Sequence, residues 1–214
     1  MLIRGAVLEE IGRARPYAES KPLTISELDL DGPGDGELLV RREEANARAG
    51  LPARIVAKMN ALVEPQMIAA LYAASQAGVE IDLIVRGVCA LRPGVPGVSE
   101  NIRVRSLLGR FLEHSRVFYF YNDGAEDVYL ASADWMDRNF FRRIEVCFPV
   151  LDRRIKKRVI DEGLKPFLER AIDIWEMQSD GSYRHARHSD RRRRAHPQEE
   201  LLNAFVGKTP NHLR

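Results

Sequence analysis

The stretch "RIVAKMNALVEPQMIAALYAASQAGVEIDLIVRG", residues 54–87, decides the fold. It contains two short apolar segments, 54–60 and 79–87, on either side of a longer run at 64–78. Pro65 lies in the first turn of this run and Gly78 lies just beyond its end, which predicts a helix between them. The nearly continuous apolar content of 79–87 is typical of a parallel strand that is covered on both faces. Strand, helix and strand together predict a right-handed βαβ unit.

The segments on both sides of this unit extend the α/β pattern. Residues 42–50 form a helix-like run that stops at Gly50, and strand-like segments follow at 101–110, 116–121, 126–134 and 142–150. A last helical segment is predicted at 152–177, with a break or kink at Gly163 and Pro166. The predicted fold class is therefore α/β, a mixed sheet flanked by helices.

Both ends of the chain differ in pattern from this centre. Residues 1–40 alternate apolar and polar residues around Pro and Gly turns, which predicts a small strand-rich appendage without a core of its own. Residues 179–214 include the run "RRRR" at 191–194 and are predicted to be a basic, disordered tail. We thus predict three parts, 1–40, 41–178 and 179–214. A basic tail can also contact polyanions, although a solvated terminus explains the same composition.

Composition excludes several classes of protein. The 214 residues are 45% hydrophobic and 30% charged, with a net charge of +2. Because no apolar run approaches the ~20 residues of a membrane span, we expect a cytoplasmic protein without one. The two cysteines are too few for a disulfide framework or a thiolate zinc site. The histidines at 185, 188 and 196 have no cysteine or carboxylate at a useful spacing, so no metal site is predicted.

Several arginines are candidates for binding phosphate. Arg86 ends the second predicted strand, and in open α/β sheets ligands bind beyond the carboxyl ends of the strands. Arg103 and Arg105 alternate on one strand, so their forked donors point to the same side and match phosphate oxygens. A solvated charged face is the alternative explanation for this second pair.

His114 begins a predicted strand as H-x-R, with Arg116 two residues later. A buried histidine of the core is the ordinary interpretation of such a residue. The segment "SADWMDRN" follows the next strand, and this order is similar to the half-site of the phospholipase D superfamily, in which one histidine attacks phosphorus and a second protonates the leaving group. The sequence departs from that pattern, because Arg116 replaces a lysine, Asp134 replaces an asparagine, and one half only is supplied.

Longer stretches resemble the C-terminal domain of bacterial polyphosphate kinases, which has a phospholipase D-like fold. The resemblance covers about 41–184 and is carried by the continuous segment 53–120, by "ASADWMDRNFFRRIEVCFPVLD" and by "IWEMQSDGSYR". It implies reversible transfer of the terminal phosphate of ATP to polyphosphate. Arg86, in "LIVRG", matches a nucleotide-phosphate-binding arginine of the family, and His114, in "FLEH", matches a histidine at the phosphates. Arg103, Arg105, Arg116 and Asp134 are further candidates for the same cleft.

The resemblance also implies what this stretch does not supply. The phosphorylated histidine and the residues that bind Mg²⁺ belong to a preceding domain of the family, so we expect an incomplete fragment that holds half of the active site and no metal ligands. ATP, ADP and polyphosphate are the implied partners. Nucleic acid is not favoured, and an oligomer stays open.

Residues 1–40 resemble a different family, the zinc-dependent alcohol dehydrogenases, through "RGAVLEEIG" and "RPYAESKPLTISELDLDGPGDGELLVR". No zinc ligand or G-x-G-x-x-G loop follows, so no oxidoreductase chemistry is expected. Two alternatives to the kinase remain. One is a non-catalytic module that binds polyphosphate or nucleic acid with strong salt dependence. The other, less favoured, is a phosphodiesterase formed by two half-sites in a homodimer.

Overall fold

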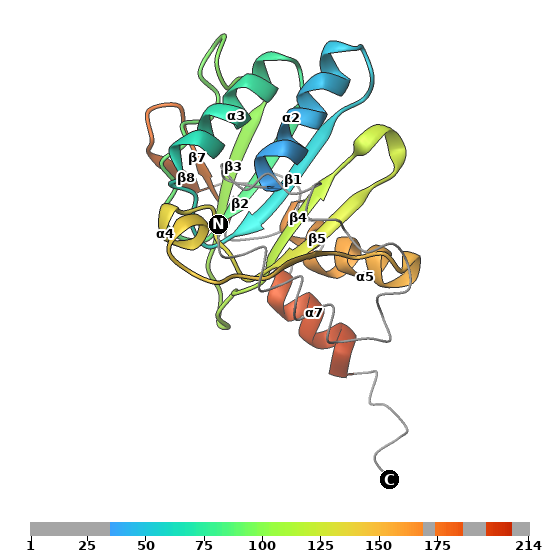
Figure 1. The fold of residues 1–214 in the computed structure, drawn as a ribbon. Helices are drawn as coiled ribbons and strands as arrows, with labels where there is room; N and C mark the ends of the chain where they lie inside the picture. Colours follow the sequence, from blue (N-terminus) through green and yellow to red (C-terminus); the bar gives the residue numbers. More distant parts are fainter. Residues whose placement is uncertain (1–34, 169–173, 186–195, 207–214) are drawn as a thin grey trace.

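The computed structural model describes residues 35–168, 174–185 and 196–206, and its centre is one mixed sheet (Figure 1). The strand order is β6-β5-β4-β1-β2-β3-β7-β8. The pairs β1–β2 and β2–β3 are parallel, and the other neighbours are antiparallel. The strands are β1 (Arg54–Met59), β2 (Glu80–Val85), β3 (Ile102–Leu107), β4 (Arg116–Phe120), β5 (Asp127–Ala131), β6 (Cys147–Pro149), β7 (Ile174–Met177) and β8 (Tyr183–His185).

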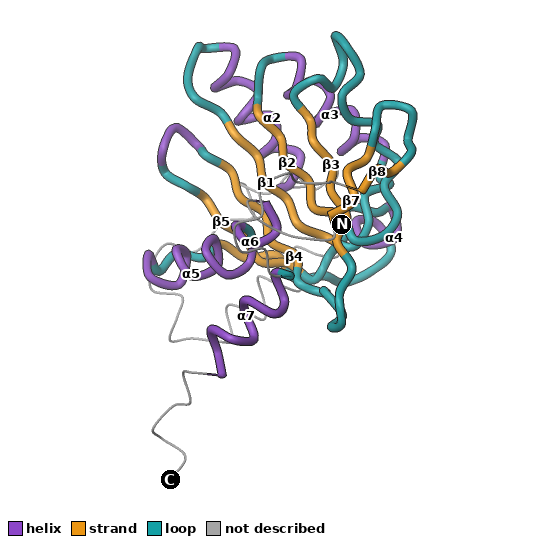
Figure 2. The backbone as a smooth tube through the Cα atoms, turned by 180° about the vertical axis from the view of Figure 1, so that it is seen from behind, coloured by secondary structure: helices purple, strands orange, loops and turns teal. Residues whose placement is uncertain are grey.

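Helices cover both faces of the sheet. In Figure 1 α2 and α3 lie on the near face, whereas α5 and α6 come to the front when the molecule is turned around in Figure 2. The described helices are α2 (Asp35–Arg48), α3 (Pro65–Gln76), α4 (Asp137–Phe141), α5 (Arg153–Gly163), α6 (Lys165–Leu168) and α7 (Pro197–Val206), with a 3-10 turn, η2, at Asn122–Gly124. The predicted α/β class and the mixed sheet flanked by helices are confirmed. Among the helices that the structure describes, none has the length and apolar content needed to cross a membrane.

The predicted βαβ unit is β1, α3 and β2. Pro65 is the first residue of α3, and the Glu64 carboxylate accepts a hydrogen bond from the Met67 amide at 2.6 Å. This contact satisfies one of the amide groups that the first turn of a helix leaves unpaired. The strands then pair in parallel from Arg54 opposite Glu80 onward.

Alternate residues of the central strands enter two separate cores. Ile55 and Ala57 lie in the core under α2 and α3, whereas Val56 lies in the core under α5 and α6. Successive strand side chains point to opposite faces, so one strand supplies both layers. Because both faces are covered, the central strands are mainly apolar, and the buried charged side chains within them, Lys58 and Asp82, need partners.

The prediction that residues 1–40 are rich in strands is wrong for the part that the structure describes. Residues 35–40 belong to α2, which continues through the expected boundary to Arg48, whereas residues 1–34 lie outside the described residues. Val40, Glu43 and Ala47 recur at helical spacing, and Val40 and Glu43 are fully buried. The Glu43 carboxylate accepts from the amides of Arg54 at 3.2 Å and Asn122 at 2.8 Å. These contacts connect the helix to the first residue of β1 and to the turn η2.

Two predictions for the C-terminal part also need correction. The break at Gly163 is confirmed, because α5 ends there, but residues 174–177 form strand β7 rather than a continued helix. Leu107 of β3 pairs with Ile174, which is buried. The predicted disordered tail contains β8 and α7 among its described residues. The arginine run at 191–194 lies outside the described residues.

Candidate functional site

Four polar residues lie at strand ends on one edge of the sheet. Asn60 follows β1, Arg86 follows β2 as predicted, Arg116 opens β4 and Asp134 comes after β5. β1 and β2 are parallel, and β4 is antiparallel to both β1 and β5. The carboxyl ends of β1, β2 and β5 therefore meet the amino end of β4 at the same edge.

Asp134 and Arg116 form a buried pair at this edge. The Arg116 Nε and Nη2 atoms donate to the two carboxylate oxygens at 3.0 and 2.9 Å. The side chains are 9% and 7% exposed. The remaining Nη1 donates to the His114 carbonyl oxygen at 3.0 Å. All three nitrogens of the guanidinium group are therefore engaged within the protein.

The charge of Asp134 is stabilised by these neighbours. Burial alone raises the pKa of a carboxyl group, but hydrogen bonds from Arg116 and from the Asn60 amide outweigh it and lower the pKa of Asp134 below its ordinary value. Asp134 is therefore an anion at neutral pH. Its role in this geometry is to accept hydrogen bonds and to balance the charge of Arg116.

Asn60 connects this pair to Arg86. Its backbone and side-chain amides donate to Asp134 Oδ1 at 2.7 and 3.3 Å. Its side-chain oxygen accepts from Arg86 Nε at 2.9 Å. Because an amide that donates through nitrogen must present its oxygen to the other side, Asp134 fixes the orientation of Asn60 toward Arg86. A continuous chain of hydrogen bonds thus runs from Arg116 to Arg86.

Arg86 differs from the other three candidate arginines in its charge balance. Arg103, Arg105 and Arg116 each lie within 4 Å of a carboxylate oxygen. Arg86 is half-buried, and among the described residues no carboxylate pairs with it and no contact engages its Nη1 and Nη2 atoms. The forked end of this one guanidinium group is therefore available to an anion.

The predicted pair Arg103 and Arg105 does share one face of β3, but it meets an acidic residue there. Both contact the buried Asp82, at 3.0 Å from Arg103 Nε and 3.7 Å from Arg105 Nη1. Arg105 also donates to the Leu168 carbonyl oxygen at 3.2 Å. Asp82 bonds to Arg54 as well, at 3.1 Å. The observed partner of Arg103 and Arg105 is therefore the carboxylate of Asp82, and their place in a phosphate cleft stays a prediction.

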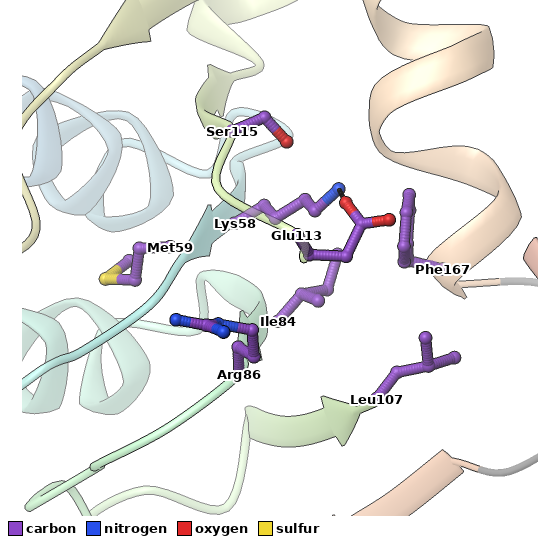
Figure 3. Close-up of a pocket in the computed structure, with 8 residues that line it drawn as sticks. All are labelled: Lys58, Met59, Ile84, Arg86, Leu107, Glu113, Ser115 and Phe167. Atoms are coloured by element: carbon purple, nitrogen blue, oxygen red, sulfur yellow. Dashed lines mark hydrogen bonds and ion pairs between the residues drawn. The ribbon is translucent and has the colours of Figure 1, made fainter. Parts of the chain in front are cut away.

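His114 is exposed and lies in the segment just before β4. It is therefore no core histidine, which was the ordinary interpretation. Its neighbours Glu113 and Ser115 line a cavity of about 10 Å³ together with Arg86 and Lys58 (Figure 3). This volume matches one water molecule. The segment that carries His114 and the strand end that carries Arg86 thus border the same small space.

Lys58 is a site residue that the sequence interpretation missed. It is 4% exposed, within β1, and its Nζ donates to Glu113 at 2.7 Å. In Figure 3 these two charged groups point toward each other, and the Arg86 fork is directed away from them. Burial lowers the pKa of Lys58, and the bond to Glu113 opposes that change. The detectable signal was a lysine within the apolar run "RIVAKM", where a buried charge needs a partner.

The described residues contain no group of three or more His, Cys, Asp or Glu side chains that could hold a metal ion. His196, which belongs to the histidine cluster considered for a metal, instead contacts the Leu108 carbonyl oxygen through Nε2 at 3.0 Å.

The strand order and the helices on both faces define the class, a mixed-sheet α/β domain, and comparison with known proteins specifies the family. The family model "Polyphosphate kinase C-terminal domain 2" matches residues 37–198, a wider range than the predicted 41–184. The chain belongs to this family.

Relatives of known sequence and structure agree. A polyphosphate kinase of Burkholderia multivorans is 68% identical over 148 residues, 69% of this chain and 22% of that protein. One from Paraburkholderia phytofirmans is 64% identical over 166 residues, 78% of this chain and 24% of that protein. The crystal structure of polyphosphate kinase from Porphyromonas gingivalis aligns with a TM-score of 0.75 at 40% identity, covering 81% of this chain and 26% of that one. The chain therefore spans about a quarter of the length of these relatives.

Proposed function

We propose that Arg86 and His114 bind the phosphate groups of ATP or polyphosphate, as part of a polyphosphate kinase active site. The observation that carries this proposal is the hydrogen-bonded chain from Arg116 through Asp134 and Asn60, which holds Arg86 at the sheet edge with its fork unpaired. A guanidinium fork fits two phosphate oxygens and stays charged at all working pH values. Membership of the polyphosphate kinase family supplies the phosphate chemistry.

The proposed reaction is the reversible transfer of the terminal phosphate of ATP to a polyphosphate chain. Such a transfer depends mainly on aligning the phosphates and balancing their charge, which preorganised cations do without rearranging. In this proposal Arg86 binds non-reacting phosphate oxygens and the exposed His114 imidazole donates a hydrogen bond to a further one. Magnesium, which the family implies, has no ligand set among the described residues, so no step is assigned to it.

We further infer that this stretch of chain supplies only part of the site, because it corresponds to 22% of a complete relative. Binding of phosphate is then separable from turnover. A protein of these 214 residues should bind tripolyphosphate and should form no polyphosphate from ATP and magnesium when followed by phosphorus NMR. Synthesis of polymer, or phosphorylation of His114, would contradict the incomplete site and would require a complete one, for instance across a dimer.

The experiment for binding is calorimetric titration of tripolyphosphate into the protein and three variants. Arg86→Ala should weaken binding more than His114→Ala, because a forked guanidinium group donates to two phosphate oxygens at once, whereas an imidazole donates to one. Arg158→Ala is the matched control, since it removes the same charge from an exposed pair with Glu162 on α5. Affinity should also fall as salt is raised. Equal losses in Arg86→Ala and Arg158→Ala would show non-specific charge attraction, which is the behaviour of a general polyanion-binding module.

A further inference from the structure

The segment 108–115, which joins β3 to β4 and carries His114, is bound on two sides by side chains outside the phosphate-binding residues. Phe111 and His114 are both exposed, and the segment has no helix or strand of its own. A segment of this kind loses its order easily unless other parts of the protein hold it. Two of the side chains that hold it bind Glu113, the residue next to His114.

The first contact comes from the sheet. Lys58 of β1 donates to Glu113 Oε2, and its Nζ also lies 3.5 Å from the centre of the Phe167 ring on α6. The ammonium group is therefore held between a carboxylate and an aromatic face in a buried position. A buried ion pair of this kind contributes little to net stability, but it defines one geometry, since breaking it leaves a charge without a partner.

The second contact comes from α7. Gln198 donates through Nε2 to Glu113 Oε1 at 2.9 Å and to the Phe111 carbonyl oxygen at 2.7 Å. Its Oε1 accepts from the Phe111 amide at 2.8 Å. One buried side chain thus binds both backbone groups of Phe111 and the free oxygen of Glu113. The segment is fixed from the sheet and from α7 at positions 111 and 113.

Beyond His114 the backbone is fixed again. Arg116 donates to the His114 carbonyl oxygen, and β4 begins at this arginine. The chain is therefore held before His114 at the Phe111 backbone and the Glu113 side chain, and again at the His114 carbonyl oxygen, whereas the His114 side chain stays exposed. Such an arrangement aims a side chain at solvent or ligand without using the imidazole for the fold.

From these contacts we propose that Lys58, Glu113 and Gln198 form a positioning clamp that aims His114 at the bound phosphate. None of the three touches the phosphate in this proposal. The inference rests on the proposed role of His114 in phosphate binding, but the clamp itself has a readout that needs no ligand. That readout is amide hydrogen exchange in residues 111–115.

The test is the double variant Lys58→Met/Glu113→Ala, which removes both charges and leaves the net charge unchanged. Replacing both partners of a buried pair avoids an unpaired buried charge, so we expect the fold to persist. Amide exchange in 111–115 should become faster, and tripolyphosphate should bind about fivefold more weakly. Adding His114→Ala to this background should have no further effect on affinity, although it weakens binding in the parent protein. Arg158→Met/Glu162→Ala, at the exposed α5 pair, is the control and should change neither readout.

Gln198→Ala provides a second variant that introduces no charge, in case the double variant does not fold. It should raise the rate of amide exchange in the same segment, and it should reduce the loss of tripolyphosphate affinity that His114→Ala causes. The proposal is overturned if His114→Ala costs the same affinity in the parent and in the clamp variants. If tripolyphosphate binding proves independent of Arg86 and His114, the proposed function has failed, and unchanged amide exchange in 111–115 would then separately overturn the clamp.

Discussion

Asp134→Asn should be among the most destabilising single changes at the site, because of how four hydrogen bonds divide between the two carboxylate oxygens. Oδ1 accepts from Arg116 Nε and from both amides of Asn60, whereas Oδ2 accepts from Arg116 Nη2 alone. The asparagine oxygen can take the Oδ1 position and keep three bonds. Its NH₂ group then faces Arg116 Nη2, donor against donor, and Arg116 loses its counter-charge.

The cost follows from the burial of the pair. Removing one partner of a buried, hydrogen-bonded ion pair leaves an uncompensated charge and typically costs about 3–5 kcal/mol. The Arg116 side chain is 9% exposed, so water compensates little of this loss. Urea unfolding at pH 7 measures the free energy of unfolding of the parent and of Asp134→Asn. Arg116→Met/Asp134→Asn is the control, and it should lose less than Asp134→Asn, because it keeps the acceptor for both Asn60 amides and removes the unpaired guanidinium group. A loss below about 1 kcal/mol in Asp134→Asn would refute the assignment of a tightly coupled buried pair.

Two further predictions concern acid stability and thiol reactivity. The pKa of Asp134 is lowered in the folded protein, so its contribution to stability is present above the ordinary pKa of an aspartate and is lost as the pH falls through the lowered folded value. Urea unfolding from pH 7 to pH 3 should therefore show a smaller loss of unfolding free energy in Asp134→Asn than in the parent. Parallel pH curves for the two proteins would contradict this. Burial raises the pKa of Cys89 to about 11, whereas Cys147 is exposed. Iodoacetamide at pH 8 should therefore label Cys147 first, as followed by mass spectrometry. Faster labelling of Cys89 would contradict the burial of its thiol.

The fold could be predicted where local signals and periodicity agreed. Pro65 opens α3 and Gly78 lies just beyond its end, and the short apolar runs on both sides form β1 and β2 as predicted. At residues 35–40 the signals disagreed, since "DGPGDGE" indicated a loop and the alternation indicated strands. The burial of Val40 and Glu43 against distant parts of the chain decided for a helix. That outcome depends on packing that the local sequence does not contain.

The same limit applied to β7. Residues 174–177, "IWEM", fit both the end of an amphipathic helix and a short strand, because four residues are too few to distinguish a period of 3.6 from a period of 2. Pairing with β3 makes this segment a strand, and the paired residues Leu107 and Ile174 are 67 residues apart in the sequence. For Lys58, by contrast, the sequence did hold a usable signal. A lysine in a covered strand requires a partner, although the identity of Glu113, 55 residues away, could not be read from spacing.

The arginines of this domain show why residue type alone could not separate binding from structural roles. Arg103 and Arg116 were candidates because forked cations suit phosphate, but forked cations suit carboxylates equally well. Their partners, Asp82 and Asp134, lie 21 and 18 residues away along the chain and become neighbours only in the sheet. Arg86 has the same chemistry and differs in what surrounds it, a neutral amide oxygen in place of a carboxylate. A neutral partner orients the guanidinium group without cancelling its charge, and this combination is what an anion-binding residue requires.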